Sequence, residues 1–175
     1  MLIKDSIIKF FKQKMSIDIT NVSIVVSQLP DNEIGQYNHS IANTITIDVA
    51  KISAIYKGAS DIMLDTCVVH ELMHLCQFQY NKSLILPINN LFSGRLINNR
   101  YVHLPAYQQP IEIDALIMEC YYLYCSDEYY TDRISPYVEH RLTNVGNVKE
   151  YTQRLKDDGF NLVINSSNNL NEKEC

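Results

Sequence analysis

Several features that would assign a chain to a special class are missing from this sequence. Its 15 lysines and arginines are scattered among 20 acidic residues and form no basic block, and the formal net charge is -5. Such a charge pattern does not predict the basic surface that binds nucleic acid or an anionic membrane. No apolar run approaches the roughly 18 residues of a membrane span, and lysines interrupt the apolar residues near the N-terminus, so we expect neither a membrane partner nor a signal peptide.

Cysteine is present, but it lacks the pattern of a disulfide framework. The five cysteines are odd in number, and no pair has the Cys-x-x-Cys spacing. Frameworks of disulfides are typical of oxidising compartments, whereas scattered thiols are typical of reducing ones. We therefore expect a cytoplasmic protein.

The length of the chain favours one domain. Its 175 residues are 46% hydrophobic, enough for one core but a tight fit for two independent domains. We expect a single domain over residues 1–164 and a disordered tail, rich in asparagine and serine, over residues 165–175.

The apolar pattern predicts an α+β fold with a short antiparallel sheet. Residues 16–28 are expected to contain a strand, because apolar side chains stand at every second position, at Val22, Ile24 and Val26. Residues 34–38 and 44–49 are expected to pair as a β-hairpin after a turn over residues 29–32.

Helical periodicity and capping signals predict five main helices and a shorter one. The five are expected over residues 2–14, 50–56, 61–80, 110–124 and 147–158. Pro110 would stand in the first turn of the fourth, where proline is tolerated. Residues 81–109 are expected to be irregular, except for the short helix over residues 90–97.

The helix expected over residues 61–80 carries the motif His70-Glu71-Leu72-Met73-His74. Two histidines four residues apart lie on one side of an α-helix and can bind one metal ion. Zinc accepts nitrogen and carboxylate ligands in a tetrahedron and, at catalytic sites, keeps one position for water. Glu71 would then act on that water as a general base. The alternative is that the three polar residues form a solvent-facing stripe that binds nothing.

The residues around the motif favour the metal. Apolar side chains wrap the helix and indicate burial on most sides; they are Leu64, Val68, Val69, Leu72, Met73, Leu75 and Cys76. A buried carboxylate without a partner would cost several kcal/mol, so polar residues in such a helix need partners.

The third protein ligand is expected in the helix over residues 110–124. Glu112 lies in its first turn, and the small Ala115 shares its face and allows close approach to the motif helix. Glu119, seven residues after Glu112, falls on the same face and is a candidate for orienting a histidine ring. Asp114 points about 200° away from Glu112, so the two cannot both face the metal. We favour Glu112, and the alternative for both is an acidic first turn that complements the helix dipole.

Other residues compete for the third position. His39, His103 and His140 each carry an imidazole, and Cys67 lies one turn before His70 on nearly the same face. Isolated loop histidines are more often surface residues, and cysteines in helices are more often core. His103, shortly before Glu112, is the most credible of these rivals.

His70-Glu71-x-x-His74 followed by Glu112-x-x-Ala115 resembles the gluzincin group of zinc metallopeptidases, including the single-domain minigluzincins and the ImmA/IrrE-like peptidases. The similarity covers residues 20–125, and only the first motif is specific. The chain departs from the group at Leu116, where members often carry an acidic residue. It also lacks the later histidine of the metzincins.

The resemblance implies a zincin-like fold and an endopeptidase that uses a zinc-activated water, with Glu71 as general base and a protein or peptide as substrate. In such enzymes a further tyrosine or histidine steadies the oxyanion, and Tyr101, His103, Tyr107 and His140 are the candidates. An edge strand from residues 34–38 or 44–48 would hold the substrate. The alternatives are a non-catalytic zinc-binding or regulatory protein and a zinc hydrolase that acts on a non-peptide substrate. The sequence does not indicate an oligomeric state.

Overall fold

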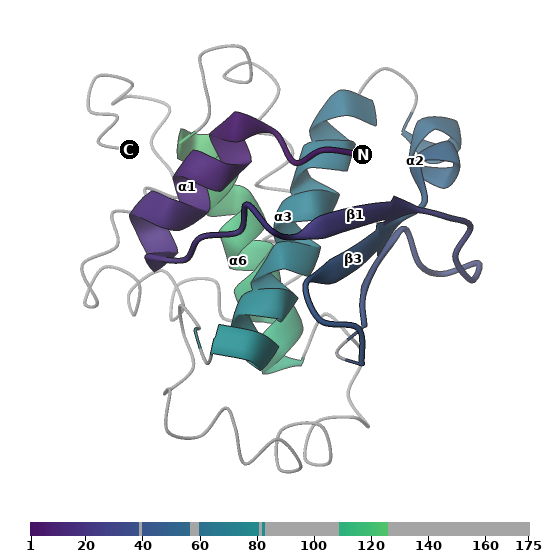
Figure 1. The fold of residues 1–175 in the computed structure, drawn as a ribbon. Helices are drawn as coiled ribbons and strands as arrows, with labels where there is room; N and C mark the ends of the chain where they lie inside the picture. Colours follow the sequence, from purple (N-terminus) through teal and green to yellow (C-terminus); the bar gives the residue numbers. More distant parts are fainter. Residues whose placement is uncertain (39, 57–59, 81, 83–108, 126–175) are drawn as a thin grey trace, which may run out of the picture. The chain divides into compact units, whose positions relative to one another are not determined.

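The computed structural model describes residues 1–38, 40–56, 60–80, 82 and 109–125. The chain divides into two units, Met1–Lys82 and Ser83–Cys175. The described residues form four helices and a three-stranded mixed sheet, which confirms the α+β class (Figure 1). The single domain expected over residues 1–164 remains a prediction, and the expected tail lies outside the described residues. Among the described helices, none has the length and apolar character that a membrane span requires.

The first helix, α1 (Asp5–Met15), buries one apolar face. Its buried residues recur at helical spacing and are Ile7, Phe10, Phe11 and Met15. The helix ends at Ser16, whose left-handed φ of 55° lets its backbone N–H donate to the carbonyl of Phe11. Just before the helix, Nζ of Lys4 lies 2.7 Å from the carboxylate of the buried Asp65. The expected amphipathic helix is therefore confirmed, although it begins three residues later than the pattern indicates.

The sheet contains β1 (Ser23–Val26), β2 (Gly35–Tyr37) and β3 (Thr44–Ile47) in the order β1-β3-β2. β2 and β3 pair antiparallel, so the expected hairpin is confirmed. β1 pairs with β3 in parallel, so the expectation of a purely antiparallel sheet is wrong. Apolar alternation fixes which side chains share a face but says nothing about strand direction. Here the chain reverses between β2 and β3, so β3 lies beside β1 and runs in the same direction.

One face of the sheet packs on the third helix. Ile45 and Ile47 of β3 have no exposed surface, and α3 (Ser60–Tyr80) contacts both β2 and β3. In β1, Ile24 is buried as the alternation predicts, but Val26 at the end of the strand is 54% exposed. The buried face of β3 therefore forms an apolar surface against which α3 packs.

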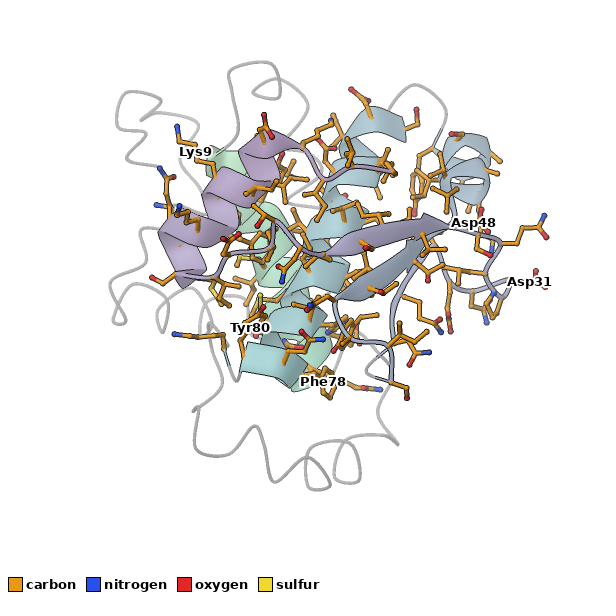
Figure 2. All side chains as sticks on the ribbon, viewed as in Figure 1. Lys9, Asp31, Asp48, Phe78 and Tyr80 are labelled. Carbon is orange, nitrogen blue, oxygen red and sulfur yellow. The ribbon has the colours of Figure 1, made fainter. Side chains whose placement is uncertain are left out.

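β3 ends earlier than predicted because the next residue, Asp48, begins a helix. Asp48 is the N-cap of α2 (Val49–Ile55), and its carboxylate accepts hydrogen bonds from the backbone N–H groups of Lys51 at 2.9 Å and Leu29 at 3.0 Å. Nζ of Lys51 donates to two carbonyls of the expected turn, those of Leu29 and Pro30, and to the carbonyl of Glu33 just after it. Figure 2 labels Asp48 and, in that turn, Asp31. The turn is thus tied to the start of α2.

The two helices expected to form the site are both present. α3 begins one residue earlier than predicted and ends at the predicted residue, and in the second unit α6 (Pro110–Cys125) begins at the predicted proline. The first-turn N–H of Ile113 donates to the carbonyl of Gln109, which proline at the first position permits. The irregular chain, the short helix at residues 90–97 and the helix at residues 147–158 lie outside the described residues.

Candidate metal centre

The motif lies in the buried middle of α3. Every residue from Asp65 to Gln77 is buried except His70, which is half-exposed. Glu71 is only 7% exposed and His74 only 8%. The three polar residues therefore do not form a solvent-facing stripe. Their burial agrees with the expectation that α3 is enclosed on most sides.

The two histidines direct the same type of atom toward each other. Nε2 of His70 lies 3.1 Å from Nε2 of His74, and the ring centroids are 4.7 Å apart at an angle of 81°. Two ligands at about 2.05 Å from a tetrahedral zinc are separated by about 3.3 Å. The spacing therefore fits a shared metal ion, as well as an N–H···N hydrogen bond between the rings when no metal is bound.

Glu112 belongs to the same group of potential ligands. One ligand atom from each of His70, His74 and Glu112 lies within 4.8 Å of the other two. Two imidazoles and one carboxylate form a donor set that suits zinc and also accepts other divalent transition metals. The group is therefore a candidate metal centre with the three ligands that the sequence favours.

The other acidic residues of α6 are not members of this group. Asp114 has no exposed surface, and Glu119 is 1% exposed. Both are thus buried, which separates Asp114 from an ordinary surface carboxylate that complements a helix dipole. The expected role of Glu119 in orienting a histidine remains a prediction.

Several candidates cannot be placed beside the centre. The rival ligands and oxyanion candidates outside the described residues are His39, Tyr101, His103, Tyr107 and His140. Cys67 is described and buried, and it is not part of the ligand group.

Sequence reasoning missed a buried partner of His74. Nδ1 of His74 lies 2.9 Å from the side-chain oxygen Oε1 of Gln77, which is 1% exposed. The sequence does contain a sign of this contact, because Gln77 is three positions after His74 and therefore shares its helix face. A buried glutamine in an apolar helix also requires hydrogen-bond partners.

Sequence reasoning also missed the role of Gly35 at the start of β2. A Cβ atom added to Gly35 would lie 2.6 Å from Sγ of Cys67 and 2.7 Å from Oε1 of Glu71. Only glycine fits this spacing without displacing a neighbour, so the backbone of β2 passes directly over the carboxyl group of Glu71. An isolated glycine in a strand pattern is a known sign of such close approach.

β2 continues along α3 beyond Glu71. The ring of Tyr37 stacks on that of Phe78 with centroids 5.9 Å apart, and Figure 2 labels Phe78 toward the C-terminal end of α3. Burial raises the pKa of the Tyr37 hydroxyl. β2 is also an edge of the described sheet, whereas β3 pairs on both sides. Of the two expected substrate-binding strands, the one at residues 44–48 is therefore wrong, because its backbone is already paired.

No family model matches this chain, and no curated protein or solved structure shows significant similarity to it. The resemblance to gluzincins therefore depends on the motif residues alone.

Proposed function

We propose that this protein is a zinc-dependent metallopeptidase in which His70, His74 and Glu112 hold the metal. The observation that carries the proposal is the convergence of two imidazole nitrogens and one carboxylate oxygen within 4.8 Å. A zinc ion bound there would lower the pKa of a bound water to about 7 and polarise a substrate carbonyl.

Glu71 is the general base of the proposed reaction. It follows His70 directly, so its carboxylate lies next to the metal ligands without being needed as one. It accepts the proton of the attacking water and returns it to the leaving amine of the cleaved peptide. A structural zinc site has no use for this second carboxylate, which favours an enzyme over a binding protein.

The substrate binds as an extended peptide along β2. This strand lies at the edge of the described sheet, and its first residue, Gly35, adjoins the carboxyl group of Glu71. A peptide that pairs with such an edge gains main-chain hydrogen bonds whatever its sequence. The position of β2 brings the backbone of that peptide close to the base.

The Glu71→Gln variant tests the catalytic part of the proposal. We expect it to bind zinc like the wild type and to lose about 10²- to 10⁴-fold in turnover, the usual contribution of a general base. The measurement is a proteome-wide cleavage profile with each protein, together with its zinc content. Cleavage at the same sites and rates by Glu71→Gln and by the wild type would overturn the assignment of Glu71.

A further inference from the structure

Gln77 and His74 form a buried hydrogen-bonded pair one helical turn apart. Oε1 of Gln77 and Nδ1 of His74 are 2.9 Å apart, and both residues are more than nine-tenths buried. An amide oxygen only accepts hydrogen bonds, so Nδ1 must carry the hydrogen in this contact. Neutral histidine holds a single ring proton, so in this tautomer Nε2 of His74 carries the lone pair and faces Nε2 of His70.

We propose that Gln77 is a positioning residue for His74. Its hydrogen bond fixes the orientation of the His74 ring and keeps the ring proton on Nδ1. The atom left with a lone pair is Nε2, which lies 3.1 Å from Nε2 of His70. The inference rests on the proposed function in one respect, namely that this lone pair binds zinc. The hydrogen bond selects the tautomer that a metal requires, before any metal arrives.

The chemistry of the acceptor separates this role from packing. A carboxylate at residue 77 would still accept from Nδ1, whereas the thioether of methionine fills similar space and is only a weak acceptor. Outer partners of this kind contribute about 10- to 100-fold to metal affinity. We therefore expect Gln77→Met to weaken zinc binding by that factor and Gln77→Glu to remain close to the wild type.

Zinc affinity is measured by competition with a chromophoric chelator on the full chain. Gln79→Met is the matched control, because Gln79 lies on the same helix but is exposed. Urea unfolding of each metal-free protein shows whether a loss of affinity is a loss of folding. Unchanged affinity in Gln77→Met, or equal losses in Gln77→Met and Gln77→Glu, would overturn the role of Gln77 toward zinc.

A second measurement needs no variant and no zinc. Nitrogen-15 NMR of histidine side chains in the metal-free wild type reports which ring nitrogen of His74 carries the proton. We expect Nδ1, and a proton on Nε2 would overturn the proposed tautomer. If the wild type binds no zinc, the proposed function fails, while the NMR result still decides the hydrogen bond. If the wild type binds zinc but His74 has the other tautomer, only the inference about Gln77 fails.

Discussion

Gly35 and Glu71 are in direct contact across the boundary between sheet and helix. A methyl group on Gly35 would lie 2.7 Å from Oε1 of Glu71 and 2.9 Å from its Cγ. Both distances are shorter than van der Waals contact, and Sγ of Cys67 would be closer still at 2.6 Å, so no side chain fits at residue 35 unless both neighbours move. This contact sets the distance between the edge of the sheet and the proposed general base.

Gly35→Ala should therefore destabilise the metal-free protein by about 1–3 kcal/mol, the usual effect of overpacking. Urea unfolding measures this change. Cys67→Ala is the matched second variant, because Sγ of Cys67 is the atom nearest to the new methyl group at 2.6 Å. The double variant should lose less stability than the sum of the two single variants. A Gly35→Ala protein as stable as the wild type would contradict the close approach.

Lys51→Met should destabilise the fold by about 1–3 kcal/mol, because three carbonyls lose a charged donor. Those carbonyls belong to Leu29, Pro30 and Glu33, at 2.8, 2.6 and 3.0 Å from Nζ. Thermal or urea unfolding gives the difference. Lys9→Met on the exposed face of α1 is the control and should change stability by less than about 0.5 kcal/mol. Equal effects of the two substitutions would show that Lys51 does not hold the turn.

Asp48 should make the stability of the fold depend on pH in the acidic range. Hydrogen bonds from the backbone N–H groups of Lys51 and Leu29 hold the pKa of its carboxyl below the ordinary value of 3.8. A lowered pKa in the folded state stabilises the protein above the unfolded pKa, and that stability is lost as the pH falls through the folded pKa.

The variant Asp48→Asn removes this charge and keeps a capping oxygen. At pH 7 its urea midpoint should lie below that of the wild type, and the difference should shrink as the pH falls below about 3.8. A difference that is the same at pH 7 and at pH 3 would show that the charge of Asp48 does not contribute.

The elements of the fold could be predicted where one pattern decided them. The buried faces of α1 and β3 follow apolar spacing, and Pro110 marks the start of α6. The parallel pairing of β1 could not be predicted, because strand direction depends on pairing between distant segments. The end of β3 was misplaced because Asp48 fits strand alternation and helix capping equally well, and its hydrogen bonds decide for the cap.

The sequence predicts the metal ligands of the candidate site but not the residues that contact them or the proposed base. The helical spacing of His70 and His74, together with an acidic first turn in α6, leads to the three residues that the structure groups. Gly35 matters because it has no side chain where Cys67 and Glu71 approach it. An isolated glycine in a strand indicates a close approach, but it does not identify partners more than thirty positions away. The i, i+3 spacing places Gln77 on the same helix face as His74, but a single polar residue among apolar ones does not identify its partner.

The most direct test of the account is the zinc affinity of the metal-free wild type compared with that of Glu112→Ala. We expect the wild type to bind one zinc ion per chain and Glu112→Ala to bind it far more weakly. His103→Ala and Asp114→Ala serve as controls and should bind as the wild type does. A wild type that binds no zinc, or a Glu112→Ala protein that binds it undiminished, would contradict the proposed metal centre.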